Sequence, residues 1–255
     1  LDALSNTTLY EINVDINTQN AFVTGSQTVV YTNDEDTELS EVYFHLFPNL
    51  LSGSIDVSNV TVDGNAVEPI LEEAFDSVMR VPLETPLAPG NSVTIGMDFV
   101  TAVPQQLERN YGVFAQVDDI MALSHFYPMV AVYDDEGWNI APASEQGDPT
   151  YGDAAFYHVT VTTDEEQVVA GSGVALSETS ADGQQTIELA IGPARDFYLA
   201  ISPRYEVVSH TVGETTINSY APAEFMDGAA AAAAFAAHPL HLFNRLFEPY
   251  PITTP

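Results

Sequence analysis

The sequence predicts a mainly β protein in which an antiparallel β-sandwich is followed by a short α/β segment. Three observations lead to this prediction: apolar and polar residues alternate from Thr8 to about Tyr205, turn-forming residues separate the alternating runs, and helical spacing follows Tyr205. Because successive side chains of a strand point to opposite faces, alternation indicates sheets with one buried and one wet face. We therefore expect a sandwich domain at residues 1–206 and the start of an α/β domain at residues 207–255.

The clearest strand is the first, in which Tyr10, Ile12, Val14 and Ile16 alternate with polar residues. The alternation recurs in three later runs: Val93, Ile95, Met97 and Phe99; Tyr157, Val159 and Val161; Ile187, Leu189 and Ile191. Residues 42–47 are apolar on both faces, which is typical of a covered central strand. Between residues 105 and 151 the alternation is lost, and we expect a long loop-rich stretch there.

Turns and a helix complete the predicted elements. Asp63-Gly64-Asn65, Asp182-Gly183 and Ala88-Pro89-Gly90 are typical of tight turns between strands. A short strand is expected at residues 216–220, and helical spacing over residues 223–247 places Phe225, Ala229, Ala232, Phe235 and Ala236 on one side. Pro239 is expected to break or kink this helix, with a second short helix after it, because proline removes one backbone hydrogen bond and crowds the preceding turn.

The charge balance excludes several classes of function. The chain carries 37 acidic residues against five arginines and no lysine, giving a formal net charge of −32. Such a surface repels phosphates, so we expect neither nucleic-acid binding nor docking on anionic membranes. Self-repulsion weakens an acidic fold at low ionic strength, which favours a saline setting or bound divalent cations. The absence of cysteine excludes disulfides and thiolate metal sites.

Several segments, taken in their order and spacing, resemble one family of enzymes. These segments are residues 42–49 (VYFHLFPN), residues 124–129 (SHFYPM), residues 134–138, Gly147-Asp148-Pro149 leading into residues 157–161, and residues 243–251 (FNRLFEPYP). Together they resemble the zinc aminopeptidases of the alanyl aminopeptidase and leukotriene hydrolase family, the gluzincin metallopeptidases, in its divergent bacterial branch. One departure is that residues 243–251 lack a glycine that the family has at the entry to its catalytic domain.

The resemblance implies both a fold and a role. It implies a saddle-shaped amino-terminal sandwich that caps and shapes the substrate cleft, followed by the start of a thermolysin-like domain. The family binds zinc through H-E-x-x-H, in which two histidines one helical turn apart face the metal and the glutamate activates its water. No H-E-x-x-H occurs within residues 1–255, so we expect this chain alone to be inactive, with no catalytic or metal-binding residue and with zinc confined to the full-length parent.

The resemblance also implies partners and a location. A peptide substrate and the missing catalytic domain are the expected partners in the parent protein, and the bacterial branch implies an exported, extracellular or cell-surface enzyme. Gln116 and Asp118 lie near the position of a pair that, in the family, grips the free amine of the substrate. A carboxylate suits an ammonium group, and a glutamine can orient it. The alternative is that Gln116, Asp118 and Asp119 form a solvated turn.

Other clusters have plainer interpretations. His238 and His241 are three residues apart with Pro239 between them, which favours a helix-surface pair over a ligand pair. The acidic runs at residues 34–36, 134–136 and 164–166 could bind calcium, but none has the spacing of an EF-hand loop, and solvated turns are the default interpretation. His45 lies in an apolar strand, where a hydrogen-bonded core imidazole is expected.

Two hypotheses of other classes stay open. The chain could be a stand-alone extracellular binding module that recognises protein or glycan through the aromatic loop around Trp138. It could also be a component of a surface assembly, in which exposed edge strands pair between copies and the chain self-associates.

Overall fold

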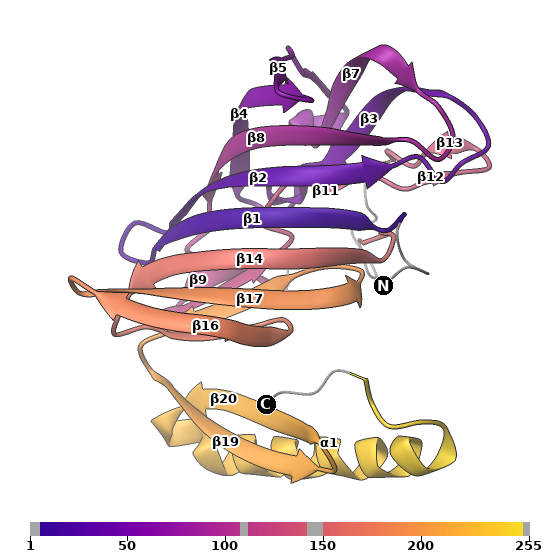
Figure 1. Cartoon of the computed structure of the whole chain (residues 1–255). Coiled ribbons are helices and arrows are strands. Elements are labelled where there is room, and N and C mark those ends of the chain that lie inside the picture. Colours follow the sequence, from indigo (N-terminus) through magenta and orange to yellow (C-terminus); the bar gives the residue numbers. More distant parts are fainter. Residues whose placement is uncertain (1–5, 108–111, 142–149, 252–255) are drawn as a thin grey trace.

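The computed structural model describes residues 6–107, 112–141 and 150–251. An eight-stranded sheet in the order β16-β17-β14-β1-β2-β8-β4-β5 dominates it (Figure 1). The strands of this sheet are β1 (Thr8–Asn17), β2 (Phe22–Thr32), β4 (Ser54–Val62), β5 (Asn65–Ala66), β8 (Ser92–Ala102), β14 (Ala155–Asp164), β16 (Val174–Ala181) and β17 (Gln184–Ala194).

Two four-stranded sheets cover the eight-stranded sheet. One has the order β15-β18-β10-β9 and the other β11-β3-β7-β6. The first comprises β15 (Val168–Gly171), β18 (Tyr198–Ser202), β10 (Ile120–Ser124) and β9 (Phe114–Val117); the second comprises β11 (Met129–Val130), β3 (Leu39–His45), β7 (Val78–Leu87) and β6 (Ile70–Glu72). Short 3-10 helices, η2 (Phe47–Leu50) and η3 (Ala74–Asp76), and a small hairpin, β12 (Tyr133–Asp134) with β13 (Gly137–Trp138), complete the sandwich.

The predicted burial of the first strand is confirmed. Tyr10, Ile12, Val14 and Ile16 are buried, whereas the residues between them are exposed. One face of the large sheet is therefore wet, and both smaller sheets pack on its other face around one apolar core. The mainly β, sandwich-like fold predicted from the alternation is confirmed.

One strand pairing differs from the antiparallel expectation. β1 and β14 run parallel, with Tyr10 opposite Tyr157, and their rings stack with centroids 4.8 Å apart. Alternation along a strand reports its two faces and carries no information on the direction of its neighbour. The long stretch of chain between β1 and β14 allows the return that a parallel pair requires.

The turns follow the predicted chemistry. Asp63 and Gly64 have φ values of 49° and 80°, and Asp182 and Gly183 have φ values of 55° and 81°. Both dipeptides join paired strands, so they form two-residue hairpin turns of the type that requires positive φ at both positions.

The stretch between residues 105 and 151 is more regular than predicted. Its described parts contain β9 to β13, whose strands of two to five residues are too short to reveal alternation. Residues 126–130 are mostly buried between the sheets, and side chains of the large sheet satisfy their backbone. Thr101 Oγ1 donates to the Phe126 carbonyl over 2.8 Å, and Gln27 Nε2 donates to the Pro128 carbonyl over 2.9 Å.

A hairpin and one helix form a separate module beyond the β16 edge of the large sheet (Figure 1). It comprises β19 (Tyr205–Val212), β20 (Thr215–Pro222), the 3-10 turn η4 (Ala223–Phe225) and α1 (Met226–Leu246), and α1 packs on both strands. The division at residue 206 stays a prediction. None of the helices in the described residues is long and apolar enough to cross a membrane.

The predicted separation of this region into two helices was wrong. Pro239 lies inside a single continuous helix, at an exposed position where water can satisfy the backbone carbonyl that proline leaves without a partner. The helix packs through its small residues: α1 buries Ala229, Ala233 and Ala237 against the hairpin, while Phe225 and Phe235 are 61% and 82% exposed. Alanines at four-residue spacing let the helix axis approach the strands more closely than phenylalanines would.

This alanine stripe can be tested by overpacking. We predict that Ala233→Leu destabilises the module by about 1–3 kcal/mol, because the larger side chain has no space beneath the helix. Ala232→Leu, at an exposed position one residue earlier, changes stability by less than about 0.5 kcal/mol. Thermal unfolding followed by the helical circular-dichroism signal measures both variants. Equal effects of the two substitutions would show that the stripe is not a packing face.

Candidate functional site

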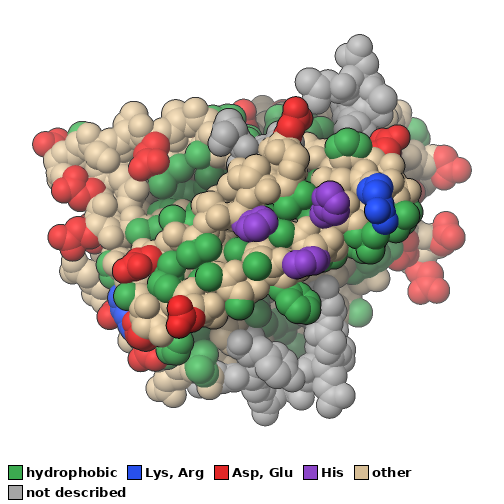
Figure 2. Space-filling view, turned by 90° about the horizontal axis from the view of Figure 1, so that it is seen from below, with side chains coloured by type: hydrophobic (Ala, Val, Ile, Leu, Met, Phe, Trp, Pro, Cys, Tyr) green, Lys and Arg blue, Asp and Glu red, His purple; other side chains and the backbone are tan. Residues whose placement is uncertain are grey.

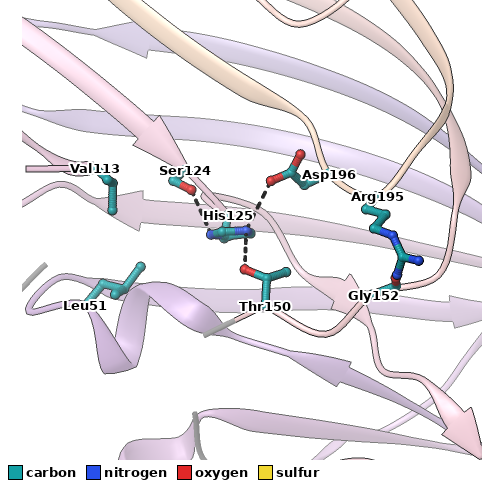
Figure 3. A pocket seen from close by; sticks show the side chains of 8 residues that line it. All are labelled: Leu51, Val113, Ser124, His125, Thr150, Gly152, Arg195 and Asp196. Atoms are coloured by element: carbon teal, nitrogen blue, oxygen red, sulfur yellow. Dashed lines mark hydrogen bonds and ion pairs between the residues drawn. The ribbon is translucent and has the colours of Figure 1, made fainter. Parts of the chain in front are cut away.

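A cavity of about 440 Å³ opens where three connections of the sandwich meet (Figure 3). Apolar side chains of Leu51 and Val113 form one end of it, and polar groups occupy the rest. The polar lining comes from the end of β10, from the segment before β14 and from the β17–β18 connection: Ser124, His125, Thr150, Gly152, Arg195 and Asp196.

His125 is the centre of the polar lining. It is buried, and both ring nitrogens have partners: Nδ1 lies 2.8 Å from Ser124 Oγ, and Nε2 lies 2.8 Å from Thr150 Oγ1 and 3.4 Å from Asp196 Oδ2. A carboxylate only accepts hydrogen bonds, so the proton of a neutral ring belongs on Nε2. Nδ1 then accepts a hydrogen bond from the Ser124 hydroxyl.

The backbone at His125 is strained. Its φ of 53° lies in the left-handed region, which costs a non-glycine residue roughly 1–2 kcal/mol. The ring also packs against Phe47, with centroids 5.1 Å apart. The hydrogen bonds and this ring contact offset the strain and hold the imidazole at the junction of β10 with residues 126–130.

The charged groups beside His125 are only partly buried. The hydrogen bond from His125 lowers the pKa of Asp196, while partial burial opposes that shift. Arg195 Nη1 donates to the Gly152 carbonyl over 2.7 Å, which ties the β17–β18 connection to the segment before β14. The cluster therefore joins three separate segments through one imidazole and one guanidinium.

The cluster contains a hydroxyl, an imidazole and a carboxylate, the three groups of a hydrolase triad. Two features favour a structural role. Ser124 is 9% exposed, and Thr150 Oγ1 lies closer to Nε2 than Asp196 does. These groups satisfy a buried imidazole and can share a proton, but they present no exposed nucleophile.

The sequence-predicted pair, Gln116 and Asp118, lies outside this cavity. Gln116 Nε2 donates to the Thr18 carbonyl over 2.6 Å, and its buried Oε1 has no hydrogen-bond partner. Asp118 is exposed in the β9–β10 turn, where it and Asp119 have φ values of 52° and 60°. The turn that was the alternative interpretation is therefore present, and a substrate-binding role for the pair stays a prediction.

The remaining sequence candidates have structural partners. His45 is buried with Nε2 3.0 Å from the Asn139 carbonyl, as expected for a core imidazole, and burial lowers its pKa. His238 Nδ1 lies 2.9 Å from the Ala234 carbonyl of its own helix. Trp138 is half-buried, and its ring packs against Tyr31, Tyr43 and Tyr133.

The described residues do not fit a zinc ion. Across residues 6–107, 112–141 and 150–251, no three His, Cys, Asp or Glu side chains are grouped so as to hold a metal. Histidines do gather on the face formed by α1 and its hairpin (Figure 2), but they form no ligand set there. Arg109, Tyr111 and the Gly147-Asp148-Pro149 segment lie outside the described residues.

The sequence did not reveal the His125 cluster. Ser124 and His125 stood within a motif that carried the resemblance, but nothing marked Thr150, Arg195 or Asp196 as their neighbours. The positive φ of His125 could not be predicted either. The preference of histidine for the left-handed backbone region is too weak to indicate that conformation from the sequence.

Comparison with known proteins finds structural neighbours only. No family profile matches the chain. No curated protein sequence matches it either. Among solved structures, the M1 zinc metallopeptidase of Deinococcus radiodurans superposes with a TM-score of 0.68 at 18% identity, covering 98% of this chain and 55% of that chain. A mutant of that enzyme bound to a Tyr-Ser-Ala substrate gives 0.66 at 16% identity with the same coverage.

The neighbours establish the fold of the chain. A two-domain M1 zinc metallopeptidase mutant bound to L-arginine matches with a TM-score of 0.64 at 16% identity. The chain spans about 55% of the length of these structures. It therefore has the fold of part of an M1 zinc metallopeptidase, and the resemblance expected from its motifs is confirmed at the level of the fold.

The His125–Asp196 contact predicts a pH-dependent contribution to stability. Because the pKa of Asp196 is lowered in the folded protein, its contribution is present above about pH 4, the ordinary carboxyl value, and is lost as pH falls through the folded-state value. Asp196→Asn should lower the free energy of unfolding by roughly 0.5–1 kcal/mol at pH 7. The effect is small because the carboxylate is half-exposed. Denaturant unfolding of this variant and of Asp56→Asn, an exposed control, measures the difference.

The difference between Asp196→Asn and the parent protein should shrink as the pH is lowered below 4, with Asp56→Asn unchanged throughout. A cost at Asp196 that is the same at pH 3 and at pH 7 would contradict the assignment.

Proposed function

We propose that this chain is the non-catalytic amino-terminal portion of an exported zinc aminopeptidase and that its sandwich caps and shapes the substrate cleft. The observation that carries the proposal is the agreement of nearly the whole chain with the fold of M1 zinc metallopeptidases, at 98% coverage. The motifs that resemble the family support it, because residues 126–129 of the SHFYPM segment are buried between the sheets. Peptide is the proposed substrate, since one neighbour is bound to Tyr-Ser-Ala.

Zinc belongs to the parent protein in this proposal. A catalytic zinc needs three protein ligands and an open position, and the described residues hold no such set. In this proposal the zinc ligands are carried by polypeptide beyond Pro255, and no step of the chemistry is assigned to the residues of this chain. An exported, extracellular or cell-surface location is part of the same proposal and rests on the family resemblance alone.

Metal content and turnover test this proposal together. We predict that residues 1–255 retain no stoichiometric zinc after dialysis and release no amino acid from an alanyl or leucyl anilide. A chain extended into the downstream reading frame should do both. Tightly held zinc with turnover in the 255-residue chain would overturn the assignment. An extended frame without H-E-x-x-H would favour the stand-alone binding module.

The hairpin–helix module carries an exposed apolar surface. This surface supports the proposal that a further domain packs there. Phe243 and Phe247 are 52% and 76% exposed, and they line a groove of about 470 Å³ with Pro239 and Tyr250. Figure 2 shows apolar side chains along this face, with most acidic side chains toward its margins. Exposed apolar patches of this kind mark interaction surfaces. In this proposal, the catalytic domain covers the groove.

The exposed groove should bind a hydrophobic dye. We predict enhanced fluorescence of an anilinonaphthalene sulfonate in moderate salt, or self-association in sedimentation experiments, with the 255-residue chain. Replacing both Phe243 and Phe247 by serine should abolish either signal. Val207→Ser on the exposed hairpin serves as the matched control and should leave it unchanged. A monomeric, dye-silent parent chain would count against a missing neighbour at this face.

The binding-module hypothesis loses one of its supports. Trp138 was the main candidate for contacting a ligand in that hypothesis. Its indole ring instead packs against three tyrosine rings and the core. The surface-assembly hypothesis retains β16, an exposed edge strand of the eight-stranded sheet, as the place where copies could pair. Electrostatic repulsion between copies of net charge −32 opposes such pairing at low salt.

A further inference from the structure

The hairpin–helix module joins the sandwich through a very short connection. β18 ends at Ser202 and β19 begins at Tyr205, so Pro203 and Arg204 alone separate them. The principal contacts of α1 are with β19, β20 and η4, all within the module. Something other than core packing must therefore fix how the module lies on the sandwich.

Arg204 contacts three segments at this junction. Its backbone N–H donates to Ser202 Oγ over 3.1 Å, at the end of β18. Its Nη1 donates to the Asp118 carbonyl in the β9–β10 turn over 2.9 Å, and its Nη2 forms an ion pair with Glu224 in η4, at the start of α1. One guanidinium thus bridges a turn of the sandwich and the entry to the helix.

The turn that Arg204 contacts is strained. Asp118 and Asp119 are the two central residues between the paired Val117 and Ile120, and both have left-handed φ values. Glycine or asparagine usually occupies such positions, so two aspartates there cost free energy. A cationic donor to the Asp118 carbonyl favours this conformation, both by the hydrogen bond and by lowering the repulsion between the adjacent carboxylates.

The charge balance makes this contact unusual. Each side of the junction belongs to a protein with 37 acidic residues and five arginines, so the sandwich and the module repel one another in general. Arg80, in contrast, pairs with Glu72 on a neighbouring strand of the same sheet. Arg204 differs because Asp118 lies in the turn between two strands of the β15-β18-β10-β9 sheet, whereas Glu224 lies in η4, after the separate β19–β20 hairpin.

We propose that Arg204 is a positioning residue that sets the orientation of the hairpin–helix module relative to the sandwich. A planar guanidinium can reach a carbonyl and a carboxylate at once in fixed directions, whereas a lysine ammonium on a flexible stem cannot hold both in the same geometry. The consequence for the proposed function is that Arg204 would align the sandwich with the catalytic domain. The alignment itself is a property of the present chain and does not depend on that function.

The absence of cysteine makes a direct distance measurement straightforward. Ser180→Cys on β16 and Ala236→Cys on α1 introduce two exposed labelling sites, one in each part. Spin labels at these sites report the distribution of distances between sandwich and module. Circular dichroism and cooperative unfolding of each labelled variant show that both parts remain folded.

Arg204→Ala should broaden the distance distribution about twofold or shift its mean, because domains without a rigid link move relative to one another. Arg80→Ala is the matched control, since it removes an Arg–Glu pair within one sheet and should leave the distribution unchanged. The distance distribution of Arg204→Lys should be as broad as that of Arg204→Ala. An unchanged distribution in folded Arg204→Ala would overturn the proposal, and full restoration by lysine would overturn the role of the guanidinium geometry. Neither result bears on the presence of a downstream peptidase domain.

Discussion

The fold depends on residues 126–130, a short segment that leads from β10 into β11 and runs through the core between the sheets. Backbone polar groups buried away from water must find partners, and here the large sheet supplies them. Thr101 and Gln27 donate to the carbonyls of Phe126 and Pro128, and the Val130 N–H donates to Tyr10 Oη. These three side chains come from β8, β2 and β1, so the position of the segment is fixed by three adjacent strands. The same segment follows His125 directly and ends in β11, which pairs with β3.

The tyrosines around this segment complete the arrangement. Tyr127 accepts a hydrogen bond from the Phe197 N–H, and its ring meets those of Tyr10 and Tyr157 edge-on. Burial raises the pKa of Tyr127 well above its ordinary value and that of Tyr157 to about 12, so these hydroxyls stay protonated in the physiological range. The cluster links the parallel pair β1–β14 to the β17–β18 connection, which carries the Arg195 and Asp196 side chains of the cavity.

The sequence predicted the parts of the fold that local patterns control. Period-two burial placed Tyr10 to Ile16 on the core side, and Asp-Gly dipeptides located two hairpin turns, because each is a property of consecutive residues. The parallel β1–β14 pair and the continuous helix through Pro239 were missed, since tertiary contacts and solvent access decide them. The cavity was missed for the same reason: His125, Thr150 and Asp196 are brought together by three separate connections. Gln116 lies in a strand and Asp118 in the turn that follows it. Their role in binding the substrate is still a prediction.

The most direct test of this account is the isosteric substitution Thr101→Val. It keeps the shape of a fully buried side chain and removes only the hydroxyl that donates to the Phe126 carbonyl. Thr94→Val, at an exposed position of the same strand, is the matched control. Thr101→Val should lower the free energy of unfolding, measured with denaturant, by about 1–3 kcal/mol, because a buried carbonyl is left without its partner. Thr94→Val should change the free energy of unfolding by less than about 0.5 kcal/mol. Equal stabilities for the two variants would contradict the claim that the large sheet holds the core segment in place.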